Sequence, residues 1–236
     1  MADTSLAKRF YKAVTTVCGP AGWSVKLDAR SLRTPAKAAL IAPTEALAEL
    51  IAEEWRRQGE AIRPDQMPAT RLAFTTIDGI SAARAAVAAD IARKADADHL
   101  CYFAPAPQVL SERQALRWVP ILDWANDDLG LELHRVVGIT HRDQPAATLE
   151  RVEALALAMD DFRLAGLAMA AGLFGSVVLA LALERGQLDG AAAFELSRLD
   201  ESFQEEQWGV DAEAAVRTEN LRDEALMLEQ WFLALQ

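Results

Sequence analysis

The sequence predicts an α+β protein: a small N-terminal antiparallel β domain with one helix, followed by a larger all-helical C-terminal domain. Alternation of apolar and polar residues, which is typical of half-buried strands, occurs near the N-terminus. The apolar period changes to that of a helix at Pro43, and helical patterning dominates after Pro68. We place the domains at residues 1–66 and 67–236, and 236 residues are enough to bury a sizeable core.

The predicted sheet lies in the first 42 residues. Residues 10–17 combine aromatic and β-branched side chains, and glycines and a proline between 19 and 22 interrupt them. Residues 23–27 then alternate between apolar and polar types, residues 28–31 supply a turn, and residues 38–42 form a further short apolar run. This order predicts strands that pair antiparallel.

A single amphipathic helix is expected to pack on this sheet. Thr44 is a good N-cap residue, and Gly59 is placed to end the helix. The face expected to carry the packing consists of Leu47, Leu50, Ile51, Trp55 and Gln58.

Helices account for most of the remaining chain. Ser111 followed by Glu112 is expected to open a helix whose core side is formed by Leu116, Val119, Leu122 and Trp124. Residues 131–139 fit either a strand or an irregular connection. From Thr148 onward the pattern predicts about five helices, with breaks at Gly172, Gly186 and Gly209 and caps at Asp189 and Asp211.

Leu164–Leu183 is 20 residues long and carries no charge, so its length suffices to cross a bilayer. Its flanks, however, provide only Arg163 and Glu184, without an aromatic belt or a basic cluster. Gly172 and Gly175 favour two shorter helices. We therefore expect a buried helical hairpin rather than stable membrane insertion, and a membrane-attached scaffold is the alternative.

Charge narrows the range of partners. The net charge is −11; residues 1–70 carry 10 basic and 8 acidic residues, whereas residues 151–236 carry 6 and 16. This acidic half disfavours nucleic acid and anionic lipid, and it suits either a basic protein surface or simple solvation. The two cysteines are far apart and form no CxxC motif, which predicts a reducing compartment. The first ten residues lack an apolar signal core, which predicts a cytoplasmic protein or a processed organelle protein.

Motifs typical of catalysis are absent from the sequence, including GxGxxG, GxxxxGK[ST], GxSxG and HExxH. A cluster of potential ligands, Asp96, Asp98, His99 and Cys101, could serve a small metal-dependent enzyme, although its spacing fits a helix end with a core-facing cysteine better. We expect no metal and no cofactor.

The acidic segment around residues 200–208 raises two further questions. Glu201 and Glu205 lie four residues apart, which could place an acid/base pair or an electrostatic binding face on one side of a helix. Trp208 follows this segment directly and could belong to the core or to an interface.

Five strings of residues together resemble one family, the assembly chaperones that attend the α subunit of F-type ATP synthase, also called ATP synthase assembly factor two. The strings, in chain order, are LDARSLRTP (27–35), AEEWRRQ (52–58), MPATRLAFTTID (67–78), CYFAPAPQVLSERQALRWVPILDW (101–124) and LDESFQEEQWG (199–209). The resemblance covers residues 10–209.

This resemblance implies a two-part fold and a non-enzymatic chaperone, expected to be a monomer, that shields the unassembled α subunit until the β subunit replaces it. It also implies partner contacts at Glu201, Gln204 and Trp208, and the spacing from Glu201 adds Glu205 to the expected binding face. The residues for which it implies structural roles are Arg30, Thr34, Pro35, Trp55, Asp78 and Trp118.

Overall fold

The structure is a computed structural model that describes residues 6–236, and it confirms the α+β class. The chain forms two compact units. The N-terminal unit comprises the described residues up to Ala82 together with Gln230–Gln236, and the helical unit comprises Ala83–Glu229. The boundary expected between residues 66 and 67 falls inside the N-terminal unit, because the helix that follows it packs against the first helix.

The N-terminal unit is built on a four-stranded antiparallel sheet, in which the central strand β2 pairs with the other three. The strands are β1 (Val14–Gly19), β2 (Gly22–Leu27), β3 (Arg30–Ser31) and β4 (Ile41–Ala42). The β1–β2 hairpin needs glycine at position 22, where φ is +126° and an added Cβ would lie 2.6 Å from the carbonyl oxygen of Ala42. The hairpin confirms the sheet, although its first strand begins later than residue 10.

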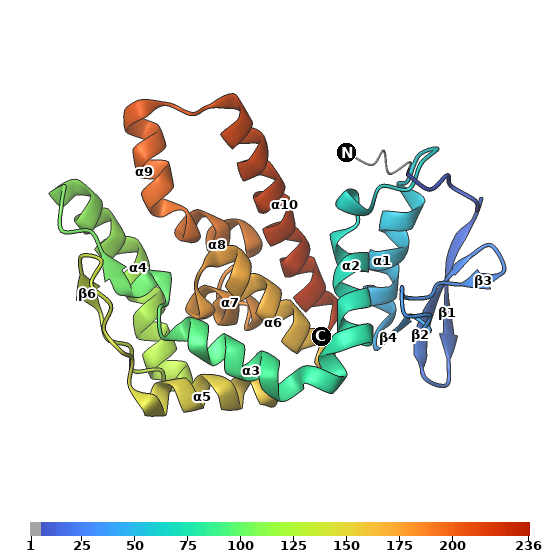
Figure 1. The fold of residues 1–236 in the computed structure, drawn as a ribbon, viewed down its shortest axis with the longest axis horizontal. Coiled ribbons are helices and arrows are strands. Elements are labelled where there is room, and N and C mark those ends of the chain that lie inside the picture. The colour runs from blue at the N-terminus through green and yellow to red at the C-terminus, as the bar shows by residue number, and fades with distance from the viewer. Residues whose placement is uncertain (1–5) are drawn as a thin grey trace. The chain divides into compact units, whose positions relative to one another are not determined.

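Helix α1 (Glu45–Arg56) packs on this sheet, and α2 (Pro68–Thr75) packs on α1 (Figure 1). The Thr44 hydroxyl accepts the N–H of Leu47 and caps α1 as expected. A one-turn 3-10 helix η1 (Pro64–Gln66) precedes α2, and a π-helical turn η2 (Thr76–Ile80) follows it.

Side chains from three of the five strings hold this unit together. The Glu54 carboxylate caps α2 by accepting the N–H of Ala69 at 2.7 Å, and the N–H and hydroxyl of Thr70 at 2.7 and 2.6 Å. The Thr34 hydroxyl donates to Asp78 at 2.6 Å, and the other Asp78 oxygen accepts the N–H of Ala36 at 3.1 Å. The strings at 27–35, 52–58 and 67–78 therefore meet in space for a structural reason.

The other residues expected to be structural in this unit differ in burial. Trp55 is buried, its ring meets Tyr11 edge-on, and its carbonyl oxygen accepts the Tyr11 hydroxyl at 2.7 Å. Arg30 and Pro35, by contrast, are exposed in and after β3. Packing therefore accounts for Trp55 but not for these two residues.

The helical unit carries eight helices in the described chain and a two-stranded parallel ladder of β5 (Tyr102–Phe103) and β6 (Val136–Val137). The helices are α3 (Ser81–Ala95), α4 (Gln108–Leu129), α5 (Ala146–Leu157), α6 (Asp161–Phe174), α7 (Val177–Glu184), α8 (Gly190–Ser197), α9 (Leu199–Trp208) and α10 (Ala212–Ala234). A one-turn 3-10 helix η3 (His99–Cys101) follows α3. The last turns of α10 belong to the N-terminal unit.

The uncharged stretch at 164–183 forms the buried hairpin of α6 and α7. Gly175 ends α6 in the left-handed region with φ of +62°, and Ser176 caps α7, all of whose residues are buried. The break lies at Gly175, whereas Gly172 continues the helix. Neither α6 nor α7 reaches 18 residues. Among the described residues, Pro68–Cys101 is the helical stretch that is long and apolar enough to cross a membrane, by length and composition alone.

The start and the orientation of α4 correct two expectations. The helix begins at Gln108, with Pro107 as its N-cap, rather than at Ser111. Leu116 was expected to face the core but is 75% exposed. The buried stripe runs instead through Leu110, Gln114, Trp118, Ile121, Leu122, Ala125 and Leu129, because the polar Gln114 takes a core position.

Candidate functional site

Helices α4 and α9 are joined by an ion pair that the two C-terminal strings supply. Arg113 on α4 donates two hydrogen bonds to the Glu206 carboxylate on α9, at 2.7 and 2.9 Å. This bidentate arrangement lowers the pKa of Glu206 and raises that of Arg113. The Arg113 guanidinium also lies 5.2 Å from the ring centre of Phe203, which is buried beneath it.

Two buried side chains of α4 fix the position of α9 and α8. The Gln114 amide donates to Asp200 at 2.7 Å and accepts the N–H of Ala104 at 2.7 Å. The indole N–H of Trp118 donates to the carbonyl of Leu196 at 3.0 Å. Buried amides are stable only when they are hydrogen-bonded, so these contacts specify one arrangement of the three helices.

The inward face of α9 contains Leu199 and Phe203, both buried. At about 100° per residue, Glu201, Gln204 and Trp208 fall together on the opposite side of the helix. All three are exposed, and Trp208 is 79% exposed. We call Glu201, Gln204 and Trp208 the outward face of α9; Trp208 does not belong to the core.

Within residues 6–236, none of the side chains of this outward face has a hydrogen-bond or ion-pair partner. Glu205, which was expected to act with them, is half-buried and accepts a hydrogen bond from Arg198 at 2.7 Å. Glu201 and Glu205 are therefore not equivalent, since one carboxylate is free and the other is neutralised within the protein.

The side chains of the proposed metal cluster do not converge. The Asp98 carboxylate is buried and accepts the N–H of Leu100 in η3 at 3.1 Å and the N–H of Val178 at the start of α7 at 3.0 Å. Burial raises the pKa of Asp98 and holds the buried Cys101 as a neutral thiol, since it raises the pKa of Cys101 as well. His99 packs edge-on against Trp118.

Asp96 faces another direction, and its oxygens meet the N–H of Gln144 at 2.8 Å and the His141 ring at 3.3 Å. His141 also lies 3.1 Å from Asp143, and these three side chains are the described group that could hold a metal ion. Asp143 is 93% exposed, and the arrangement ties the loop after β6 to the end of α3.

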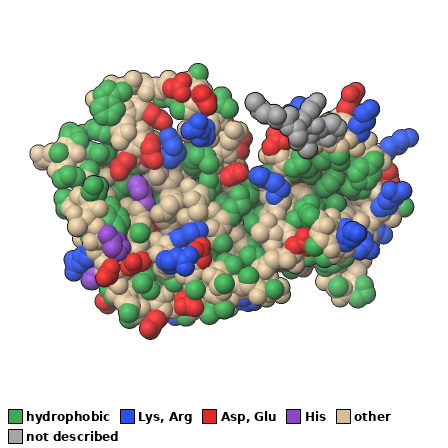
Figure 2. Space-filling model, in the orientation of Figure 1, with side chains coloured by type: hydrophobic (Ala, Val, Ile, Leu, Met, Phe, Trp, Pro, Cys, Tyr) green, Lys and Arg blue, Asp and Glu red, His purple; other side chains and the backbone are tan. Residues whose placement is uncertain are grey.

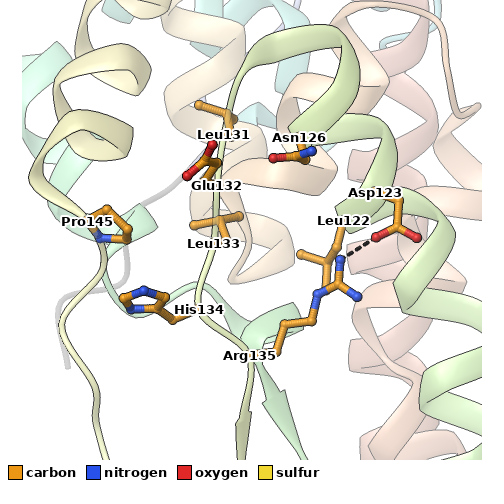
Figure 3. A pocket seen from close by; sticks show the side chains of 9 residues that line it. All are labelled: Leu122, Asp123, Asn126, Leu131, Glu132, Leu133, His134, Arg135 and Pro145. Carbon is orange, nitrogen blue, oxygen red and sulfur yellow. Dashed lines mark hydrogen bonds and ion pairs between the residues drawn. The ribbon is translucent and has the colours of Figure 1, made fainter.

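A small cavity of about 220 Å³ lies between α4 and the segment that precedes β6. Figure 3 shows its lining, in which Arg135 reaches across to pair with Asp123. The lining residues are Leu122, Asp123, Asn126, Leu131, Glu132, Leu133, His134, Arg135 and Pro145. The Arg135 guanidinium is thus engaged by an internal carboxylate.

Sequence reasoning missed several residues that shape this surface. Arg113 and Arg198 neutralise Glu206 and Glu205, and their pairing depends on contacts between helices that are distant in the sequence. Val210 and Val216, near the connection of α9 to α10, are 54% and 64% exposed. The sequence signal for Val210 and Val216 was the presence of two valines six positions apart in a polar segment.

The profile of the family described as "ATP12 chaperone protein" matches residues 8–126. "Protein atp12, mitochondrial" of Schizosaccharomyces pombe is 26% identical over 86% of this chain and 74% of its own length.

Solved structures agree along nearly the whole chain. The crystal structure of Atp12 from Paracoccus denitrificans has a TM-score of 0.90 at 38% identity, and the match covers 98% of this chain and 99% of that one. A putative chaperone from Agrobacterium tumefaciens, Atu1473, has a TM-score of 0.91 at 40% identity, covering 98% of this chain and 87% of that one. These findings confirm the resemblance to ATP synthase assembly chaperones, and this chain belongs to the ATP12 chaperone family.

Proposed function

We propose that this protein binds the unassembled α subunit of F-type ATP synthase and shields its intersubunit surface until the β subunit replaces it. The observation that carries the proposal is the outward face of α9, where a tryptophan that is 79% exposed lies on the same side of the helix as a carboxylate without a partner among the described residues. Tryptophan at an exposed position is a frequent anchor of protein interfaces.

The different roles of the residues in the string at 199–209 support this proposal. Asp200, Phe203, Glu205 and Glu206 all have roles inside the protein, in packing or in pairing with α4 and Arg198. The outward face has no such role, so stability of the fold does not explain an exposed tryptophan there. A contact with another protein does explain it.

The chemistry of an unassembled subunit fits a surface of this kind. A subunit surface that will later face another subunit is apolar and prone to self-association until it is covered. A chaperone that covers such a surface must later be displaced, which favours moderate affinity and a mixed apolar and charged face. Trp208 provides the apolar part and Glu201 the charged part.

The proposal involves no catalysis, no cofactor and no nucleic acid. The relatives that match are named as ATP12 or as chaperones. The relatives come from bacteria and from a mitochondrion, and we propose that this protein acts in the bacterial cytoplasm or, for a eukaryotic source, in the mitochondrial matrix.

The test is binding of the purified α subunit to the full chain and to its Glu201→Lys variant. Reversing an exposed charge near a partner charge changes the binding free energy by about 1 to 2 kcal/mol, so binding should weaken about tenfold. Glu150→Lys is the matched control, because Glu150 is an exposed glutamate on α5 that also lacks a partner among the described residues.

Unchanged folding of both variants, with weaker binding in Glu201→Lys only, is the expected result. Equal binding by the wild type and both variants would show that Glu201 does not contribute to the interface. If the wild type does not bind the α subunit and does not delay its aggregation, the proposed function is wrong.

A further inference from the structure

The first half of α10 carries no buried side chain. Residues 212–224 are all exposed or half-exposed, whereas the following turns contain the buried Ala225, Met227 and Leu228. A helix of about 13 residues is marginal in water without tertiary packing. Because residues 212–224 bury no side chain, this part of α10 is a helical extension whose surface is available to another molecule.

Three exposed apolar residues lie close together in the sequence around the connection of α9 to α10. Trp208, Val210 and Val216 are 79%, 54% and 64% exposed, and they lie on both sides of Gly209. Figure 1 shows α9 and α10 as two separate coils joined only by this short connection. Single exposed apolar residues are ordinary, but three within nine positions of the chain favour an interaction site.

The same segment is strongly acidic. Residues 199–224 contain nine acidic and two basic residues, a net charge of −7. Both basic side chains are already paired within α10, Arg217 with Glu213 at 3.5 Å and Arg222 with Glu219 at 4.0 Å. Asp223, like Glu201, has no partner among the described residues and is exposed.

The exposed positions of α10 repeat the spacing found on α9. Val216, Glu219 and Asp223 lie at i, i+3 and i+7, so they share one side of the helix, and all three are exposed. On α9 the order is carboxylate, amide, tryptophan, and on α10 it is valine, carboxylate, carboxylate. In each helix the apolar side chain lies nearer to the connection than the unpaired carboxylate does.

We propose that residues 199–224, the α9–α10 arm, bind a basic amphipathic segment of the client protein. An apolar side chain of that segment contacts Trp208, Val210 and Val216, and its Lys or Arg residues meet Glu201 and Asp223. Arg113 and Arg198 offset two of the nine acidic residues, so the arm keeps a net charge of about −5. Charge complementarity selects this occupant, because that charge repels an acidic peptide or an anionic lipid headgroup. The inference rests on the proposed function and adds α10 to its binding surface.

The experiment measures binding of the purified α subunit to full-length Val216→Asp and Asp223→Lys variants. Ile139→Asp and Glu150→Lys are the matched controls, because Ile139 is 97% exposed on the loop after β6 and Glu150 is exposed on α5. Both arm variants should bind about tenfold more weakly than the wild type, and both controls should bind as the wild type does. Helix content and denaturant unfolding confirm that each variant folds.

Salt provides the second measurement. Binding that depends on a basic client segment should weaken as the salt concentration rises, and Asp223→Lys should reduce this dependence, whereas Val216→Asp should not. The inference is overturned if the wild type binds but both arm variants bind equally well, in which case the proposed function still stands. If the wild type itself fails to bind, both proposals are wrong.

Discussion

Replacing Trp208 with alanine should separate binding from folding. The side chain is 79% exposed and has no hydrogen-bond partner within residues 6–236, so its removal deletes no internal hydrogen bond and little buried area. Exposed substitutions of this kind usually change the free energy of unfolding by less than about 0.5 kcal/mol. Denaturant unfolding of Trp208→Ala should therefore coincide with that of the wild type.

The effect on binding can be estimated from the exposed area. An aromatic side chain buries about 150 to 250 Å², so the exposed part of Trp208 offers about 120 to 200 Å² to a partner. At about 25 cal/mol per Å², complete burial is worth at most about 3 to 5 kcal/mol. Because alanine truncation at interface anchors typically costs about 2 kcal/mol or more, we expect binding of the α subunit to weaken about 30-fold.

The assay is a direct binding titration, by calorimetry or fluorescence, with Ile139→Ala as the control at another highly exposed apolar position. Binding should weaken in Trp208→Ala and stay unchanged in Ile139→Ala. The reasoning is refuted if Trp208→Ala binds as tightly as the wild type. It is also refuted if this variant loses several kcal/mol of stability, which would make Trp208 a packing residue.

Three further predictions concern the fold. Burial raises the pKa of Glu54 above its ordinary 4.5, so the folded state binds the Glu54 proton more tightly than the unfolded state does. The resulting stabilisation is fully present below about pH 4.5 and is lost as the pH rises through the folded-state pKa. Denaturation of Glu54→Gln, measured as a function of pH, should lack this pH-dependent stabilisation. Asp98→Ala leaves two buried N–H groups unpaired and should lower the denaturant-measured free energy of unfolding by about 2 to 4 kcal/mol, whereas a change below about 0.5 kcal/mol would contradict the assigned capping role. Gly190→Ala places a Cβ 2.5 Å from the carbonyl oxygen of Ala225, so thermal or denaturant unfolding should show a loss of about 1 to 3 kcal/mol; an unchanged stability would mean that α8 and α10 are less closely packed.

Sequence patterns predicted correctly the elements that neighbouring residues in the sequence determine. Thr44 and Asp189 cap α1 and α8 with their own side chains, as N-cap residues do wherever they precede an apolar helical stripe. The hairpin of α6 and α7 followed from its flanks and from glycine, although the break fell at Gly175 rather than Gly172. A positive φ selects one of several glycines, and only the folded backbone reveals which.

The orientation of side chains within a helix was harder to predict. Leu116 is apolar yet exposed, while the polar Gln114 is fully buried, because Gln114 finds hydrogen-bond partners in Ala104 and Asp200. Such partners lie far away in the sequence, so an apolar pattern alone places the wrong residue in the core.

The same limit applied to the candidate site. The acidic string at 199–209 indicated a charged surface, but the sequence did not distinguish the free Glu201 from the paired Glu205. That distinction depends on Arg198 and on the way α9 lies against α4. The overall charge asymmetry is visible in Figure 2, where Lys and Arg side chains are frequent over the part that contains β1 to β3.

The central claim is that the outward face of α9 contacts the client directly. A photoreactive amino acid at position 204, in place of the exposed Gln204, tests this contact, and the same probe at Glu150 is the control. The account predicts a crosslink to the α subunit from position 204 alone, which disappears when the β subunit is added. Equal crosslinking from both positions, or none from position 204 while the α subunit is bound, would contradict the account.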